Sequence, residues 1–552
     1  MERAPIIGFR ASRGSTVRGS RASWDTVGDQ IVETAQRVFG HKSLRPGQYE
    51  AVRALLDGHD VLLIQPTGAG KSLAYQLPAV LINGPTLVVS PLLALQEDQT
   101  TRLEEYGHQT VARRVSSAET KTEREEVLAD AAAGKVEFLF LAPEQLANDE
   151  VLAAVTAMRP SLIAIDEAHC MSSWGHDFRP DYLRLGELLD GLRSARVIAL
   201  TATAAPPVRE DIIERLQLKS PVVVVGGTAR ENIYLAVFRC LDERDQRTKV
   251  IDTVANTAGP GIVYVATRRA AEDYAQELET RGIAVAAYHA GQPKRRREEV
   301  QQNFMITESG VMIATSAFGM GIDKPDIRFV LHAQAPESPD EYYQQVGRAG
   351  RDAQSAVGML FYRPEDLGLA RFFNSSIPKE DDIAAVLGAV ATQAHAARAE
   401  LTRVTGLSTR KIGRILNLLS ETGLEPDTSA VEQVIARAEA YRSMQKSRIE
   451  MMRAYAETMR CRRQFLLQYF GEVDPRPCGV CDNCHAGTAT DEPKLDGPFA
   501  VEQRVQHDSF GPGMVMSLDG EEITVLFDDV GYRTLFLPTV LERRLLEPAK
   551  DQ

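Results

Sequence analysis

Eight residues near the start of the chain combine glycines, a lysine and a hydroxyl side chain in an order suited to binding phosphate. They are Gln65, Pro66, Thr67, Gly68, Ala69, Gly70, Lys71 and Ser72. The glycines let backbone N–H groups close on a polyphosphate at the start of a helix. The Lys71 ammonium can then reach the outer phosphates, and the Ser72 hydroxyl can hold Mg²⁺. The strict signature has Gly where this chain has Gln65, so the loop taken alone is also compatible with an ordinary turn.

Two adjacent carboxylates follow the apolar run Leu162–Ile165. An acid at the carboxyl end of a parallel strand beside a phosphate loop can hold Mg²⁺, and a second acid can orient and deprotonate an attacking water. We assign Asp166 to the first role and Glu167 to the second. The alternative, an acidic helix start without chemistry, is disfavoured by the phosphate loop earlier in the chain.

Four of the six cysteines lie close together near the C-terminus: Cys461, Cys478, Cys481 and Cys484, in the pattern Cys-x16-Cys-x2-Cys-x2-Cys. Four thiolates at such spacing predict a tetrahedral Zn²⁺ site that serves folding. In a chain of 552 residues the pattern favours metal over disulfides, and hence a reducing compartment.

Short apolar runs alternate with helical patterns on either side of these residues. Runs that are continuously apolar predict strands buried on both faces, as in a parallel α/β sheet. We therefore expect two α/β domains, over residues 29–225 and 226–365, and two such domains with one phosphate loop suggest a motor. The expected strands are Val61–Ile64, Thr86–Ser90, Phe138–Leu141, Leu162–Ile165, Val197–Leu200, Val222–Val225, Gly261–Val265, Ala284–Tyr288, Val311–Ala314 and Phe329–His332.

Composition narrows the class of protein. Hydrophobic residues make up 44% and charged residues 25%, as in globular proteins, and no apolar run is long enough for a membrane span. The net charge of −13 argues against a protein that coats nucleic acid over its whole surface, but leaves room for a local basic groove. We expect a cytoplasmic location without membrane contact.

Further segments flank the two domains. Residues 1–28 are rich in Arg and Ser, and three interpretations stay open: a disordered tail, a transit peptide or a DNA-touching arm. Residues 366–432 are expected to be helical, with helix-turn-helix spacing over Leu401–Ile412. Residues 433–486 form the expected zinc domain. A linker over 487–498 then precedes a small β-barrel over 499–552.

The run Ile165–Pro180 resembles the second motif and the aromatic-rich loop of RecQ-family helicases. The resemblance covers residues 35–365 and then the zinc region. It implies two tandem RecA-like domains, the cofactors ATP, Mg²⁺ and Zn²⁺, and a 3′–5′ DNA helicase of bacterial repair and recombination that is associated with the nucleoid. The implied substrates are single-stranded DNA and tailed or forked duplexes. Other motifs in the family's order are Leu44–Gln48, Ser90–Leu92, Asp98–Gln99, Ala142–Glu144, Leu200–Ala204, Tyr288–Gly291, Ala317–Pro325 and Gln344–Asp352.

The resemblance also implies roles for single residues around the nucleotide. Gln48 suits the adenine edge and Arg45 can stack on the base, while His41 stands where the family usually has Tyr. Arg348 and Arg351 lie three residues apart and are expected to reach the γ-phosphate, with Arg351 as the arginine finger. Such a finger contributes about 10³- to 10⁵-fold in rate in related systems.

An aromatic and cationic cluster follows the acids and is expected to contact DNA. It consists of Trp174, His176, Phe178 and Arg179, and His289 in the second domain joins this set. Bases stack on aromatic rings whatever their sequence, so this loop could report single-strand occupancy to the catalytic acids. Packing of Trp174 in a core is the alternative interpretation. Beside the first zinc cysteine, three further residues are expected to line the nucleic-acid path: Arg460, Arg462 and Arg463.

The chain departs from the family pattern after the zinc cysteines. The family's usual winged-helix domain is not recognisable there, and residues 499–548 instead resemble the Tudor or SH3-like barrel of UvrD-type helicases. That module is either a docking site for a protein or nucleic acid, or a plain capping barrel. Two alternative functions therefore stay open: a DNA-stimulated ATPase that translocates or anneals without separating strands, and an ATP-gated binding adaptor.

Overall fold

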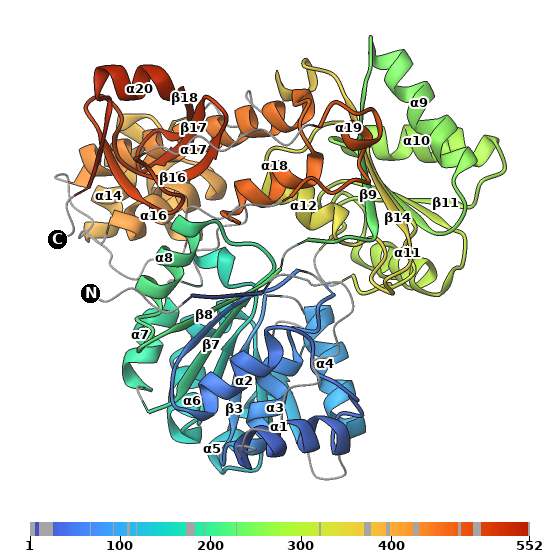
Figure 1. Cartoon of the computed structure of the whole chain (residues 1–552). Coiled ribbons are helices and arrows are strands. Elements are labelled where there is room, and N and C mark those ends of the chain that lie inside the picture. Colours follow the sequence, from blue (N-terminus) through green and yellow to red (C-terminus); the bar gives the residue numbers. More distant parts are fainter. Residues whose placement is uncertain are drawn as a thin grey trace. The chain divides into compact units, whose positions relative to one another are not determined.

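The computed structural model describes residues 6–9, 26–66, 68–91, 93–106, 111–116, 119–172, 182, 184–192, 194–227, 229–319, 322–368, 377–392, 398–422, 430–472, 476–489 and 498–549 (Figure 1). They fall into two compact units. The first unit comprises the described residues of Met1–Tyr234, Ile251–Leu331 and Tyr343–Gly358. The second comprises those of Leu235–Val250, His332–Tyr342 and Met359–Gln552.

An eight-stranded parallel sheet forms the centre of the first α/β domain, in the order β1-β8-β2-β7-β6-β3-β5-β4. Five of its six inner strands are buried along their whole length, as their continuous apolar character predicts, and in the sixth only Arg196 is partly exposed. The strands are β1 (Ile6–Phe9), β2 (Val61–Ile64), β3 (Thr86–Val89), β4 (Ala112–Val115), β5 (Phe138–Leu141), β6 (Leu162–Ile165), β7 (Arg196–Thr201) and β8 (Val222–Gly226).

The first strand lies within residues 1–28, the segment for which a disordered tail, a transit peptide and a DNA-touching arm stay open. Ile6–Phe9 pairs in parallel with Val223–Gly226, so these four residues are ordered at the edge of the sheet. Pairing satisfies backbone groups of β8 that would otherwise form an open sheet edge. A run of four residues is too short to show a periodic pattern among the surrounding arginines and serines.

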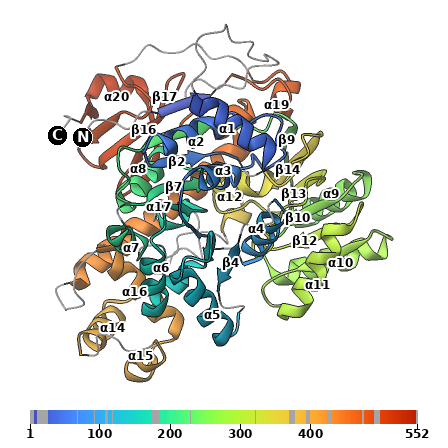
Figure 2. The same cartoon turned by 90° about the horizontal axis from the view of Figure 1, so that it is seen from below.

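Helices pack against this sheet, and α1, α2 and α3 lie side by side (Figure 2). A second apolar cluster joins these three helices through Ile31, Val52 and Leu77. The main core lies between sheet and helices, where Leu63 of β2 packs with Tyr75 of α3. The helices are α1 (Thr26–Arg37), α2 (Gln48–Leu56), α3 (Leu73–Leu81), α4 (Leu93–Tyr106), α5 (Lys121–Ala132), η1 (Pro143–Ala147), α6 (Asp149–Met158), η2 (Ala168–Met171), α7 (Arg184–Gly191) and α8 (Pro206–Arg215).

A six-stranded sheet in the order β11-β12-β10-β13-β14-β9 forms the second α/β domain. Its strands β10, β11 and β12 are parallel, and the two tandem parallel-sheet domains predicted from the sequence are thereby confirmed. The strands are β9 (Ile233–Arg239), β10 (Gly261–Tyr264), β11 (Val285–Tyr288), β12 (Val311–Ala314), β13 (Phe329–His332) and β14 (Ala356–Tyr362). The helices are α9 (Glu243–Asn256), α10 (Arg268–Thr280), α11 (Lys294–Ile306) and α12 (Pro339–Val346).

A helical region follows, with its own core that includes Ile383, Leu401 and Ile412. The predicted helix-turn-helix spacing corresponds to α15, a turn at Gly406 and α16. Gly406 has φ = 69°, a left-handed conformation that glycine adopts without strain. The helices of this region and of the zinc domain are α14 (Glu380–Thr392), α15 (Arg398–Thr405), α16 (Thr409–Thr422), α17 (Val431–Glu457), α18 (Arg462–Tyr469) and α19 (Asp482–His485).

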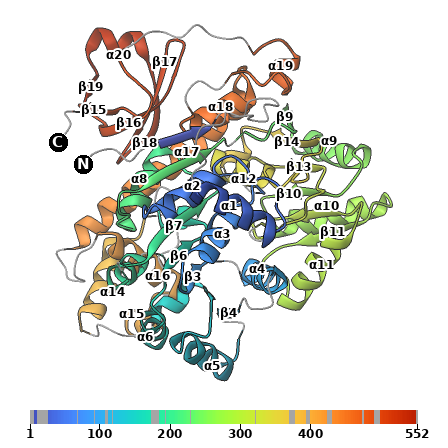
Figure 3. The ribbon, with the colours of Figure 1, turned by 60° about the horizontal axis from the view of Figure 1, so that its bottom comes forward.

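The chain ends in a five-stranded antiparallel sheet in the order β18-β17-β16-β15-β19 (Figure 3). Val505, Val515, Val525 and Phe527 form the centre of its small core. The elements are β15 (Arg504–His507), β16 (Gly511–Asp519), β17 (Glu522–Phe527), β18 (Gly531–Phe536), α20 (Leu537–Arg543) and β19 (Leu546–Pro548). In the part of the chain that the structure describes, every helix is too short or too polar to span a membrane.

Candidate nucleotide site and zinc centre

The glycine-rich loop lies between β2 and α3, as predicted. Gly68 and Gly70 have φ of 82° and 79°, conformations in which a Cβ would be strained. Of the predicted phosphate-loop residues, Thr67 lies outside the described residues. The loop therefore has the backbone turn that a phosphate-binding loop needs, at the carboxyl end of a buried parallel strand.

Gln65, which occupies the first loop position in place of glycine, fills a space left by two other glycines. Its Nε2 donates to the Pro46 carbonyl oxygen at 2.6 Å. A Cβ added at Gly47 would lie 2.7 Å from this Nε2, and one at Gly226 would lie 2.9 Å from the Gln65 Cγ. The larger residue is tolerated here because its neighbours have no side chains.

Lys71 and the two predicted carboxylates come together at the edge of the sheet. The Lys71 Nζ donates to the Gln65 carbonyl oxygen at 3.0 Å. Burial lowers the pKa of Lys71, while the charges of Glu167 and Asp166 oppose that shift. Burial, reinforced by Glu167, raises the pKa of Asp166 to about 7. This arrangement is a compact cationic and anionic cluster in which proton and phosphate chemistry is feasible.

Glu167 has φ = 50°, a left-handed conformation that is uncommon for a residue with a side chain and recurs at functional sites. One of its carboxylate oxygens lies 3.3 Å from the Nδ1 of His169. The same ring nitrogen lies 3.1 Å from the Thr201 hydroxyl oxygen. Because Thr201 ends β7, the carboxylate is connected to the motif Leu200–Ala204 through one buried imidazole.

Three further groups hold Ser72 and Asp166 in place. The Gln99 Nε2 donates to the Ser72 hydroxyl oxygen at 3.0 Å. The Ser90 hydroxyl donates to the Asp166 Oδ2 at 3.4 Å, and the Glu167 N–H donates to the Asp166 Oδ1 at 3.0 Å. The side chains predicted to hold Mg²⁺ are thus oriented by residues of the predicted motifs Ser90–Leu92 and Asp98–Gln99.

The residues predicted to bind adenine are turned onto the phosphate loop. Gln48 is only 3% exposed; its Nε2 donates to the Gly70 carbonyl at 2.9 Å, and its Oε1 accepts from the Arg45 N–H at 2.8 Å. The Arg45 guanidinium donates to the Gly68 carbonyl at 2.6 Å. His41 is exposed after α1. In this state the Gln48 amide is engaged within the chain on both sides.

A cavity of about 390 Å³ opens beside the loop in the first unit. Its lining includes Gly68 and Ala69 of the loop and three arginines, Arg45, Arg230 and Arg351. Backbone N–H groups and guanidinium groups are the donors that polyphosphates require. Arg230 was not singled out from the sequence, because it belongs to none of the matched motifs.

The two predicted finger arginines occupy different surroundings. Arg351 lies against the phosphate loop, where a Cβ at Gly68 would be 3.0 Å from its Cγ. Its Nη1 donates to the Ile322 carbonyl and to the Asp323 carboxylate, both at 2.7 Å. Arg348 is 4% exposed and donates to the Gly319 carbonyl. Arg351 lines the cavity beside the phosphate loop, whereas Arg348 is not among the lining residues.

The predicted DNA loop with Trp174, His176, Phe178 and Arg179 lies outside the described residues. His289, the remaining member of that set, is 8% exposed and its Nε2 lies 2.8 Å from the Glu272 carboxylate.

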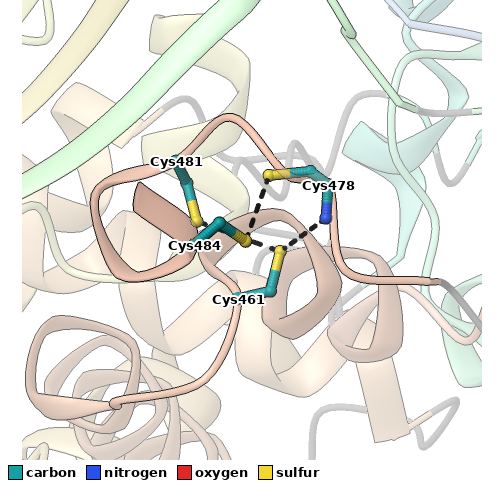
Figure 4. Close-up of side chains that lie close together, drawn as sticks. All are labelled: Cys461, Cys478, Cys481 and Cys484. Atoms are coloured by element: carbon teal, nitrogen blue, oxygen red, sulfur yellow. Dashed lines mark hydrogen bonds between the residues drawn. The ribbon is translucent and has the colours of Figure 1, made fainter. Parts of the chain in front are cut away.

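The four predicted zinc ligands come together in the second unit (Figure 4). Their sulfur atoms all lie within 4.8 Å of one another, and the pairs Cys478–Cys484 and Cys461–Cys481 are 3.9 Å apart. A tetrahedral site with Zn–S bonds of about 2.3 Å puts sulfurs about 3.8 Å apart. The Cys478 N–H also donates to the Cys461 sulfur at 3.1 Å, which favours a thiolate. The four cysteines therefore fit zinc.

The arginines next to these ligands correct another expectation. Arg462 and Arg463 are 5% and 7% exposed, so the prediction that they line a nucleic-acid path is wrong for both. Arg462 holds the zinc domain together instead: its Nε donates to Asp482 at 3.0 Å and its Nη1 to the Tyr455 carbonyl at 2.6 Å. Sequence spacing identified the ligands but not which of the adjoining cations are buried.

Comparison with known proteins gives the family. Residues 45–212 match the DEAD/DEAH box helicase family, residues 245–353 the helicase conserved C-terminal domain and residues 425–485 the RecQ zinc-binding family. The ATP-dependent DNA helicase RecQ of Synechocystis sp. is 35% identical over 478 residues, which cover 83% of this chain and 98% of that protein. The chain belongs to the RecQ family. The cofactors of this RecQ-family chain are thus ATP, Mg²⁺ and Zn²⁺, as predicted.

Other RecQ-family relatives extend the match. The probable ATP-dependent DNA helicase RecS of Bacillus subtilis is 40% identical over 341 residues, covering 62% of this chain and 68% of that protein. The ATP-dependent DNA helicase RecQ of Haemophilus influenzae is 35% identical over 81% of this chain, and the chain spans only 62% of that relative's length. A solved structure of Mss116p bound to ssRNA and AMP-PNP, 14% identical, covers 81% of this chain and 94% of its own with a TM-score of 0.54, which shows a shared fold alone.

Proposed function

We propose that this RecQ-family chain is an ATP- and Mg²⁺-dependent DNA helicase that moves 3′ to 5′ on single-stranded DNA and opens tailed or forked duplexes in DNA repair and recombination. The observation that carries the proposal is the convergence of Lys71, Asp166 and Glu167, with Arg351 close enough to lower the pKa of Lys71 further. Phosphoryl transfer needs this combination of a phosphate-binding cation, metal-binding and water-orienting acids, and an arginine.

The loop and the acids have separate roles in this proposal. Backbone N–H groups of Gly68, Ala69 and Gly70 cradle the phosphates, and Lys71 contacts the outer ones. Ser72 and Asp166 would hold Mg²⁺, and the bound ion would supply charge neutralisation at the phosphate oxygens. Glu167 accepts the proton of the attacking water, with His169 orienting its carboxylate at 3.3 Å.

Arginines and the residues before α2 complete the proposed nucleotide site. Arg351 stabilises the charge that develops on the γ-phosphate, and Arg348 supports the same segment. Gln48 exchanges its bonds to the loop for the adenine edge, while Arg45 and His41 lie beside the base. The remaining loop residue, Thr67, belongs to the same phosphate contact set.

The proposed DNA path uses the loop after the acids. Trp174 and Phe178 stack on unpaired bases, and His176, Arg179 and His289 contact the strand. In the proposed cycle ATP binding draws the two α/β domains together and hydrolysis releases them, so that the strand advances. Each base-pair step that is opened costs about 1.4 kcal/mol of stacking on average.

The test is strand separation on duplexes with a 3′ or a 5′ single-stranded tail, at equal concentrations of protein, ATP and Mg²⁺. We expect the 3′-tailed duplex to open and the 5′-tailed duplex to stay paired, and Glu167→Gln to abolish opening while retaining ATP binding. Hydrolysis that is stimulated by DNA without opening of either duplex would replace this proposal by a translocase or annealing activity.

A further inference from the structure

Arg230 and Asn232 lie between β8 and β9, outside every motif that the sequence brought out. The Arg230 Nη1 donates to the Gly347 carbonyl at 2.8 Å, and its Nη2 donates to the Ala349 and Gly350 carbonyls at 2.7 and 2.9 Å. The Arg230 side chain thus binds the turn Gly347–Gly350, which contains Arg348 and leads to Arg351.

Asn232 binds the same turn from its other end. Its Nδ2 donates to the Gly350 carbonyl and to the Gln354 carbonyl, both at 2.8 Å. The fit is close, because a Cβ at Gly350 would lie 2.4 Å from this Nδ2 and the Gly350 φ of 58° already disfavours a side chain. The backbone N–H of Ala356 also donates to the Asn232 carbonyl at 3.0 Å, which ties Asn232 to the start of β14.

These acceptors need partners. The carbonyls of Gly347, Ala349 and Gly350 lie just beyond α12, which ends at Val346, and all three residues are buried, so their oxygens need donors from within the chain. A cation at a helix C-terminus is also favoured by the helix dipole. The planar guanidinium of Arg230 meets three carbonyls with two nitrogens, a geometry that the single ammonium of lysine cannot reproduce.

Arg230 lines the cavity together with Arg45 and Arg351, so a direct contact with phosphate is the obvious alternative. The geometry of Arg230 opposes it, since both terminal nitrogens donate to backbone carbonyls. Arg351, by contrast, lies against Gly68 of the phosphate loop.

We propose that Arg230 and Asn232 are positioning residues that hold the Gly347–Gly350 turn, and so fix where Arg351 meets the phosphate loop. The proposal rests on the proposed function, in which Arg351 acts on the γ-phosphate. Displacement of a catalytic group by about 1 Å can reduce a rate about 10²-fold. Loss of the carbonyl contacts is therefore expected to act on turnover rather than on nucleotide binding.

The kinetic test measures kcat and KM for ATP at saturating single-stranded DNA in the full chain. Arg230→Gln and Arg230→Lys are both expected to lower kcat roughly 10- to 100-fold with KM within about threefold, and Asn232→Ala to lower kcat less. Arg269→Gln, at a residue whose side chain is 92% exposed on α10, is the matched control and is expected to leave both unchanged. A rise in KM with kcat retained, or rescue by lysine, would overturn the proposal in favour of direct phosphate binding.

A double variant shows whether Arg230 acts through Arg351. If it does, Arg230→Gln combined with Arg351→Ala is no slower than Arg351→Ala alone, because the group being positioned is already gone. Multiplicative losses would contradict the proposal.

Hydrogen exchange provides a readout that does not need activity. Arg230→Gln is expected to speed amide exchange in residues 347–352 while leaving β2 and β6 protected as in the parent chain. Unchanged exchange in this turn would refute the positioning role. If the parent chain itself failed to hydrolyse ATP, the proposed function would be refuted. Faster exchange of residues 347–352 in Arg230→Gln would still show that Arg230 holds this turn.

Discussion

The Tyr469 hydroxyl of α18 donates a hydrogen bond to the Asp340 carboxylate in the first turn of α12. Tyr469 also stacks on Tyr532 of β18, with ring centroids 5.0 Å apart. Burial acts to lower the pKa of the adjacent Arg448, but Tyr469 and Asp340 outweigh it and raise that pKa. One buried polar cluster within the second unit thus includes residues of the C-terminal sheet, α17, α18 and α12. The β18 side of the C-terminal sheet therefore contacts α17 and α18 of the same unit.

This cluster predicts an effect on stability. Tyr469→Phe keeps the ring but leaves the Asp340 carboxylate, which is 6% exposed, without that hydroxyl. We expect the free energy of unfolding to fall by about 1–3 kcal/mol in urea denaturation. Asp340→Asn is the partner variant, and the two losses should be less than additive when combined. Additive losses would mean that the bond contributes nothing.

The phosphate loop predicts a steric rescue. Gly226→Ala places a Cβ 2.9 Å from the Gln65 Cγ and should push the loop out of position. We expect the KM for ATP to rise several-fold in steady-state hydrolysis, and the double variant Gly226→Ala with Gln65→Gly to recover at least half of the loss. Failure of the smaller residue at position 65 to rescue would show that Gly226 matters for another reason.

Glu119 predicts a dependence of stability on pH. Partial burial acts to raise its pKa, but bonds from the Ser116 N–H and hydroxyl and from Arg114 hold the pKa below its ordinary value of 4.5. A carboxyl with a depressed folded-state pKa stabilises the fold above its unfolded pKa, and the contribution disappears as pH falls through the folded pKa. Glu119→Gln should therefore unfold more easily than the parent chain at pH 7, by about 1 kcal/mol, and equally easily well below pH 4.5. A difference that persisted unchanged at acidic pH would contradict this account.

The zinc centre predicts a selective loss of metal. Cys481→Ser removes one of four ligands and should lower zinc content well below one atom per chain, measured by atomic emission after gel filtration. Because structural zinc can supply about 10–16 kcal/mol in small peptides, the variant should also lose cooperative unfolding of the zinc domain. Cys240→Ser is the control, since Cys240 lies outside the cluster, and its zinc content should match the parent chain. Equal zinc in both variants would contradict the assignment.

The inner strands of both α/β domains could be predicted because burial on both faces makes them continuously apolar. β2, β5 and β6 have the bounds that their apolar runs indicated. The strands that were missed include the edge strands β1, β4 and β9. Of these, β4 carries Arg113 and Arg114 between two buried residues, so its sequence does not read as a buried run. For β4 the edge position removes the signal, because one side of the strand faces solvent.

The candidate site was predictable as far as it depends on strand ends and motif spacing. Lys71, Asp166 and Glu167 could be placed together because parallel strands deliver their carboxyl ends to one edge of a sheet. The contacts of Arg230 with backbone carbonyls could not be predicted, since the residue types in a sequence do not show where the backbone carbonyls point. The same holds for the space that Gly47 and Gly226 leave for Gln65.

The most direct test of the central claim is the rate of ATP hydrolysis by the full chain with Mg²⁺, measured with and without single-stranded DNA. The account predicts a stimulation of at least about tenfold by DNA, and rates at background for Lys71→Ala and Glu167→Gln under both conditions. Hydrolysis that is indifferent to DNA, or that survives loss of Lys71, would contradict the assignment of this site to a DNA-driven motor.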